Sequence, residues 1–381
     1  MASRSDIPAS QTSFVTRSAG KPVTTCAAPE RLFSRAVVRK ILTALLVLGP
    51  IAVILEHAGA GDLTIFAVAA LALIPLAWLI GEATEHAAHH TGPGIGGFLN
   101  ATFGNAPELI IALIAVNNGL TEVVLGSLSG SVIGNLLLVL GFSLIFGGRG
   151  QVDRESSLVS LTMVGVATAL LLIPSIPGWD GDPQRHALAR LSIPISIVLL
   201  IVYLIVTVLA LRRHRGMHVA GEPSEMTGWS LAFSLGVLAA ATVVTAFVAE
   251  ALVGSLEVFA DKANLSEFFV AAVIVAIVGN AAEHGGAIVV AAKGNIKLAA
   301  EIALASSAQV AVFLIPAVAL LSWALTPLAL SFRVVEMVVL GGAVVFTSFI
   351  LWGGQSSRLR GAMLIAAYVV VAIAFFVVGD R

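Results

Sequence analysis

Long apolar runs separated by short polar breaks fill the chain from residue 41 to its end. Eleven of these runs are long enough to cross a bilayer as helices. They cover approximately residues 41–58, 63–88, 97–117, 121–147, 156–175, 188–211, 228–255, 266–292, 296–324, 333–352 and 360–378. Glycine, proline and asparagine gather in the breaks, as at 92–94 (GPG) and 117–119 (NNG). The pattern predicts an all-α polytopic membrane protein with eleven transmembrane helices.

Composition agrees with this class. Of 381 residues, 58% are hydrophobic and only 11% are charged, which excludes an ordinary soluble domain. The net charge of −1 gives no bulk attraction to nucleic acid, so the expected partner is the lipid bilayer. The single cysteine, Cys26, leaves neither a disulfide nor a cysteine metal site within one chain. Residues 1–40 are basic and rich in Ser and Thr, which favours a disordered cytoplasmic tail over a transit peptide.

One short polar motif occurs twice inside the apolar runs. It reads GNAPE at 104–108 and GNAAE at 279–283, an offset of 175 positions. The same offset pairs Ser131 with Ser306, without any gap between the motif and these serines. Agreement of this kind is typical of an internal repeat.

The longest polar break divides the chain into two halves. We expect a tail at 1–40, an extra first helix at 41–60, five-helix repeats at 61–211 and 228–381, and a cytoplasmic linker at 212–227. Because each repeat has an odd number of helices, the second enters the membrane in the opposite sense. Such inverted-topology repeats hold their substrate near the bilayer midplane.

Orientation follows from the basic residues. With eleven helices, sixteen of the 21 Lys and Arg residues fall on the side of the N-terminus and five on the other. Cytoplasmic loops carry the excess of such residues. The sequence therefore predicts a cytoplasmic N-terminus and an external C-terminus, and we expect a multi-pass protein of a bacterial inner (plasma) membrane.

Glu108 and Glu283 place ionisable groups deep inside predicted spans. A carboxylate at that depth is costly and by default marks a functional site. Two carboxylates held close in a medium of low dielectric cannot both carry charge unless a cation joins them. Protons and a cation would then compete for the pair, which is what antiport requires. The alternative is a structural pair of protonated acids hydrogen-bonded between helices.

The surrounding donors are all oxygen atoms, which suits a hard cation such as Ca²⁺. Asn105 and Asn280 lie one turn before the acids and either bind the cation or orient the acids. Pro107 removes the hydrogen bond to the carbonyl of Phe103, which becomes a candidate ligand. Two glycines of the motifs allow helices to approach closely: Gly104 and Gly279.

Other polar residues are candidates for proton coupling or the ion path. Glu85 and Glu250, on the preceding helices, are either interfacial acids or a vestibule that attracts cations. His284 follows Glu283, whereas Leu109 holds the matching position in the first repeat. Four more lie in the helices after the motifs: Ser131, Asn135, Ser306 and Gln309.

A different class of protein is suggested by His86, His89 and His90. Together with Glu82 or Glu85 they could hold zinc in an intramembrane metalloenzyme. That hypothesis leaves the repeated motif unexplained.

The stretches 100–135 and 275–311 resemble the two conserved repeats of the calcium/proton exchanger (CAX) branch of the cation/calcium exchanger superfamily. The resemblance extends from about residue 41 to the end. It implies a ten-helix inverted-repeat core with an extra first helix, with Glu108 and Glu283 as the main cation ligands. It also implies that Glu85 and Glu250 match polar residues along the ion path. Pro107 departs from the family pattern.

The sequence therefore predicts a Ca²⁺/H⁺ antiporter, not an enzyme, that exports cytosolic Ca²⁺ by alternating access and needs no cofactor. Its substrates would be Ca²⁺ and protons. A Na⁺/Ca²⁺ exchanger, a Na⁺(K⁺)/H⁺ exchanger and a passive channel are the alternatives, and Asn105 and Asn280 favour protons over Na⁺. Association into a homo-oligomer is left open.

Overall fold

The structure is a computed structural model of the chain and describes residues 35–179, 186–215 and 228–379. The predicted tail up to residue 34 and the predicted linker from 216 to 227 lie outside the described residues. From Lys40 onward the described helices form one packed unit.

The elements of the first half follow the apolar runs. They are α2 (Arg35–Leu45), α3 (Leu48–His57), α4 (Asp62–Phe103), α5 (Ala106–Asn117), α6 (Thr121–Ile133), the π-helical η1 (Gly134–Val139), α7 (Leu140–Gly147), β1 (Gly150–Gln151), α8 (Arg154–Trp179) and α9 (His186–Arg215).

The second half repeats this order without the leading helices. It contains α10 (Leu231–Ala263), α11 (Glu267–Phe269), η3 (Val270–Val275), α12 (Ala276–Gly279), α13 (Ala281–Ala292), α14 (Ile296–Gln309), η4 (Val310–Leu314), α15 (Ile315–Leu321), η5 (Ser322–Ala324), α16 (Val334–Leu351), β2 (Gln355–Ser356) and α17 (Arg358–Val378).

The helices are long and apolar enough for a polytopic membrane protein. Within the described ranges, nine helices could cross a membrane, or ten when the bent pair 267–279 and 281–292 counts as one span. The run predicted at 97–117 is divided between the end of α4 and the short apolar helix α5. The count of eleven spans therefore stays a prediction.

α4 is not straight, although helical residues follow one another from Asp62 to Phe103. A Cβ atom added to Gly96 would lie 2.8 Å from the carbonyl oxygen of Ala88. In a straight helix, residues eight apart are separated by about 12 Å along the axis. The chain therefore turns back sharply near 92–94, where the sequence predicts a break.

The two motifs give the same backbone in both halves. α5 and α13 share bounds at the offset of 175, and each begins after an asparagine outside the helical region, Asn105 (φ −102°, ψ 17°) and Asn280 (φ −90°, ψ 2°). Only the first copy has a proline, Pro107, and the second is nevertheless bent by 56°. The shared asparagine, rather than the proline, accompanies the break in both copies.

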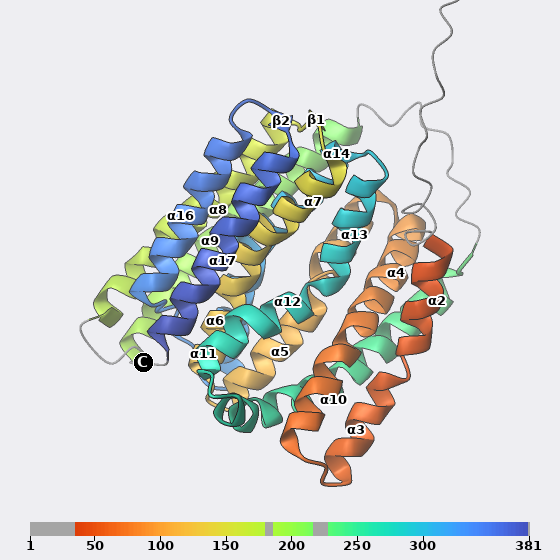
Figure 1. Cartoon of the computed structure of the whole chain (residues 1–381), viewed down its shortest axis with the longest axis vertical. Coiled ribbons are helices and arrows are strands. Elements are labelled where there is room, and N and C mark those ends of the chain that lie inside the picture. The colour runs from red at the N-terminus through yellow and green to blue at the C-terminus, as the bar shows by residue number, and fades with distance from the viewer. Residues whose placement is uncertain (1–34, 180–185, 216–227, 380–381) are drawn as a thin grey trace, which may run out of the picture. The chain divides into compact units, whose positions relative to one another are not determined.

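Packing places these broken helices at the centre. α4 packs along α10, while α12 and α13 contact α4 on one side and α6 or α7 on the other. Figure 1 shows α5, α12 and α13 between the pair α4 and α10 and the group of α7, α8, α16 and α17. The charged motif residues are thereby carried into the middle of the bundle.

Two ion pairs connect the halves at opposite ends of the bundle. Lys297, in the first turn of α14, lies 2.8 Å from Asp153 just before α8, beside the β1–β2 ladder. Glu122, in the first turn of α6, pairs with Arg333 just before α16. Lys297 and Glu122 occupy matching positions in the repeat, so the contact is duplicated with its charges exchanged.

Candidate functional site

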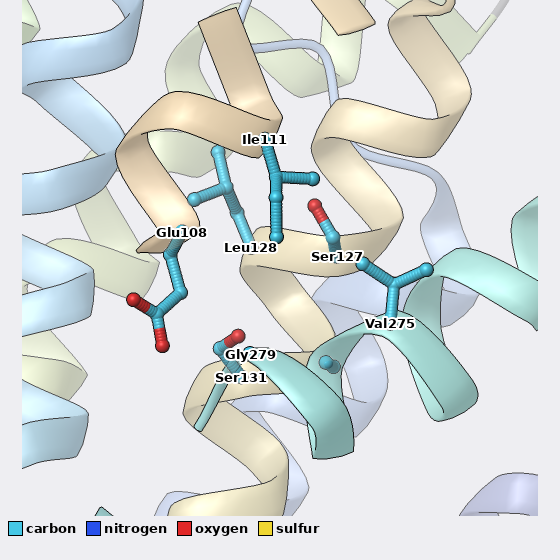
Figure 2. A pocket seen from close by; sticks show the side chains of 8 residues that line it. Glu108, Ile111, Ser127, Leu128, Ser131, Val275 and Gly279 are labelled. Atoms are coloured by element: carbon cyan, nitrogen blue, oxygen red, sulfur yellow. The ribbon is translucent and has the colours of Figure 1, made fainter. Parts of the chain in front are cut away.

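A small pocket lies where the first motif meets the second. Its polar lining comes from Glu108, Ser127 and Ser131, and Figure 2 shows Glu108 of α5 reaching toward Gly279 of α12. The remaining lining is apolar or has no side chain: Ile111, Leu128, Val275, Ala276 and Gly279. A carboxylate and two hydroxyl groups thus converge in otherwise apolar surroundings.

Glu108 packs against Gly279. A Cβ atom added to Gly279 would lie 3.4 Å from Cγ and 3.5 Å from Oε1 of Glu108, which is ordinary van der Waals contact, so the carboxylate lies directly beside α12. The side chain of Glu108 is only 9% exposed, and its Oε2 atom is buried without a hydrogen-bond partner. A buried acceptor left unpaired costs free energy that a bound cation or proton would recover.

Asn280 supplies a second oxygen of this kind. It is 1% exposed, and its Nδ2 donates to Ser131 Oγ at 2.8 Å and to the carbonyl of Ala276 at 2.9 Å. These two bonds fix the amide, and its Oδ1 atom remains buried without a partner. Glu108, which lies against Gly279, and Asn280, which follows Gly279 in the chain, thus each carry a buried oxygen without a hydrogen-bond partner.

Glu283 has different surroundings. It lies in the first turn of α13, is half-buried, and accepts a hydrogen bond at Oε2 from Ser306 Oγ. Asn135 Nδ2 donates to the same hydroxyl at 3.0 Å, and Asn135 Oδ1 lies 3.1 Å from His284 Nε2. Glu283 thus belongs to a hydrogen-bonded network that includes Asn135 and His284.

Most residues predicted for the site come together. Asn105, which is 1% exposed, reaches Gln309 Oε1 with its Nδ2 at 3.5 Å, a long hydrogen bond. Phe103 ends α4 and Gly104 lies in the break before Asn105, while Pro107 is in the first turn of α5. Their predicted roles as ligand and packing residues stay predictions.

Glu85 and Glu250 are placed elsewhere. Both are exposed, on α4 and α10, and neither lines the pocket described above. Ser127 lines the pocket, and sequence reasoning overlooked it. Its position one helical turn before Ser131 was the available signal, because residues four apart share a helix face.

Trp229 packs against the histidine cluster. The ring of His86 stacks on Trp229 at 4.8 Å, and His90 Nε2 lies 2.8 Å from the carbonyl oxygen of Trp229. Across the part of the chain that the structure describes, no three His, Cys, Asp or Glu side chains are arranged to hold a metal ion. The metalloenzyme hypothesis therefore lacks its metal site there.

Comparison with known proteins extends over both halves. The chain matches the family described as sodium/calcium exchanger protein over residues 62–212 and 233–377. It is 37% identical to a Ca²⁺/H⁺ antiporter of Synechocystis over 88% of this chain and 97% of that protein. It is 40% identical to the Ca²⁺/H⁺ antiporter ChaA of Bacillus subtilis, over 82% of this chain and 92% of that protein.

Solved structures give the same result. The structure of native YfkE superposes with a TM-score of 0.75 at 37% identity and covers 88% of this chain and 99% of YfkE. The H⁺/Ca²⁺ exchanger CAX shares the fold, with a TM-score of 0.70 at 14% identity over 91% of this chain and 93% of that one. The chain therefore belongs to the sodium/calcium exchanger family.

Proposed function

We propose that this protein is a secondary transporter, not an enzyme, that exchanges Ca²⁺ for protons. Membership of the exchanger family and the similarity to two Ca²⁺/H⁺ antiporters support the class. One observation of the site carries the proposal: Glu108, packed against Gly279, and Asn280, the next residue after that glycine, each hold a buried oxygen without a hydrogen-bond partner, Oε2 and Oδ1. Oxygen donors of this kind suit Ca²⁺, and a carboxylate also takes a proton.

The transport cycle follows from competition at one site. On the cytoplasmic side Ca²⁺ displaces protons from Glu108 and Glu283, because the two carboxylates need a positive charge between them. The core then slides relative to α4 and α10, the first helices of the two five-helix repeats, and opens the site outward. Protons return to the acids there and release Ca²⁺.

We further propose eleven spans, two inverted repeats and a cytoplasmic N-terminus. The matched bounds of α5 and α13 support the repeat. At the β1–β2 end, the segments 147–156, 293–297 and 352–360 carry six basic and two acidic residues. At the other end, the segments 58–63, 117–122, 186–190, 261–267 and 322–334 carry three basic and four acidic residues. Excess positive charge favours the cytoplasm for the β1–β2 end of a bacterial inner-membrane protein.

The decisive experiment is Ca²⁺ uptake into proteoliposomes driven by an imposed pH gradient. We expect Glu108→Gln and Glu283→Gln each to abolish uptake while the protein still folds. Asp261→Asn, an exposed acid at the end of α10, is the matched control and should transport normally. Near-normal flux in either glutamine variant would remove that acid from the site.

Competition gives a second readout from the same vesicles. Below the pH at which the pair takes up protons, the apparent affinity for Ca²⁺ should fall about tenfold per pH unit for each proton displaced. Saturating Ca²⁺ should restore the rate. A pH-independent affinity with a falling maximal rate would show that protons act at another site. Driving uptake with Na⁺ or K⁺ gradients instead of protons tests the alternative exchangers.

A further inference from the structure

The β1–β2 end of the bundle carries two arginines, Arg154 and Arg360, that form no ion pair with the described part of the chain. β1 and β2 pair antiparallel, and the Val152 amide extends the ladder to the Gly354 carbonyl at 2.9 Å. The ladder fixes the loop 352–355, between α16 and α17, against the segment that precedes α8. Arg154 and Arg360 therefore extend from a fixed platform.

Arg154 and Arg360 both reach this loop. The guanidinium carbon of Arg154 lies 5.5 Å from the ring centroid of Trp352, and Arg360 donates to the carbonyl of Gln355. Among the described residues neither arginine forms an ion pair. The nearby carboxylate of Asp153 is already bound by Lys297. Two guanidinium groups are thus available to an anion, and planar guanidinium suits phosphate oxygens.

An apolar stripe leads away from this loop along α16. Trp352 is 68% exposed, and Phe349, Val345 and Val338 on the same helical face are 70%, 70% and 67% exposed. Figure 1 shows α16 on the side of the bundle away from α4 and α10, so this face is turned outward. A tryptophan at the end of an exposed apolar helix face is typical of the membrane interface.

We propose that this is a binding site for an anionic phospholipid. The phosphate lies between Arg154 and Arg360, and an acyl chain follows Trp352 and Phe349 along α16. The apolar stripe favours a lipid over free phosphate, because a soluble anion would gain nothing from contact with an apolar helix face. This lipid site requires only that the chain is embedded in a membrane, and it does not depend on which ion the protein transports.

Trp352 provides a local readout of the bound lipid. The full chain and its Trp352→Phe variant are reconstituted in phosphatidylcholine containing the same fraction of brominated phosphatidylglycerol or brominated phosphatidylcholine. The difference between the two proteins isolates Trp352 from the other four tryptophans. We expect the anionic brominated lipid to quench Trp352 more strongly, with each arginine contributing about fivefold to its local enrichment.

Charge variants test the two arginines. Arg154→Gln/Arg360→Gln should make the two lipids quench equally, and each single variant should lose part of the preference. Arg149→Gln removes an exposed arginine of the same segment that does not contact Trp352, and should keep the preference. Should the double variant fail to fold, the single variants decide.

Three results would overturn the proposal. They are equal quenching in the unmodified chain, a preference that survives both single variants, and a loss of preference on adding inorganic phosphate at constant ionic strength. The last would identify a site for the free anion. An unchanged preference in phosphate supports the lipid.

Discussion

Gly130 offers the sharpest test of how packing shapes the site. It lies in α6 where this helix crosses η3, and a Cβ atom added there would overlap the carbonyl oxygen of Ala272 and lie 2.7 Å from its carbonyl carbon. Backbone cannot rotate out of the way, so Gly130→Ala must separate the two helices. Restoring a contact of 3.4 Å to that carbon alone requires a shift of about 0.7 Å, and clearing the carbonyl oxygen requires a larger one.

The loss of stability in Gly130→Ala follows from the burial of both helices at this contact. Ala272 is 1% exposed and Gly130 is buried, so overpacking should destabilise the protein by about 1–3 kcal/mol. The shift also reaches the site, because Ser131 follows Gly130 and Ala276 lies one turn after Ala272, and both line the pocket. If about 1.4 kcal/mol falls on the loaded site, the apparent affinity for Ca²⁺ drops about tenfold.

Gly134, one turn further along, is the matched control. A Cβ atom added there meets nothing within 4 Å. Gly134→Ala should therefore leave transport intact and gain up to about 1 kcal/mol from the lower backbone entropy of alanine. Thermal unfolding in detergent and initial Ca²⁺ uptake into vesicles measure both variants. Equal stability and equal uptake in the two would refute the reasoning.

Three further outcomes are expected. Arg333→Gln removes a 6% exposed cation that binds Glu122 and lies 4.1 Å from the centroid of the Phe268 ring, so it should lower the stability by about 3–5 kcal/mol. Lys297→Gln, in the exposed pair with Asp153, should lower it by at most about 1 kcal/mol, and equal unfolding temperatures of the two variants would contradict this. The hydrogen bond from Lys297 holds the pKa of Asp153 below its usual range, so the stability contributed by this pair is present at neutral pH and lost as the pH falls through that lowered pKa. Carboxyl NMR should show the pKa of Asp153 rising in Lys297→Gln. Asn135→Leu disconnects His284 from Ser306 and should slow Ca²⁺ flux; it should also cost about 1–3 kcal/mol of stability, because buried His284 Nε2 loses its partner, and unchanged flux would leave this network without a role in transport.

Much of the backbone could be predicted because glycine, asparagine and proline act locally. The break after 92–94, the turns at Gly119 (φ 77°) and Gly294 (φ 87°), and the start of α5 and α13 after asparagine all follow from the identity of those residues. The offset of 175 also carries through the secondary structure. The division of the run 97–117 between two helices was not predicted, because a bend inside an apolar run leaves its hydrophobic pattern unchanged.

The partners of individual side chains could not be predicted from the sequence, for a different reason. Whether His90 meets a metal or the Trp229 carbonyl depends on how α4 packs against the start of α10, some 139 positions away. Likewise, Glu85 and Glu250 fit the composition of an ion path, yet both are exposed on their helices and lie outside the pocket lining. Such contacts are set by tertiary packing and have no local signal.

The repeated backbone nevertheless holds an unsymmetrical site. Ser131 accepts from Asn280 of the other repeat, whereas its counterpart Ser306 donates to Glu283 of its own repeat. This difference leaves Glu283 with a hydrogen-bond partner and Glu108 with an unpaired oxygen. Glu108 comes from the first half of the chain and the other unpaired oxygen, on Asn280, from the second, so neither half alone supplies both oxygens. Under the proposed function, cation binding would therefore depend on the contact between the halves, and a motion that separates them would be expected to release the cation.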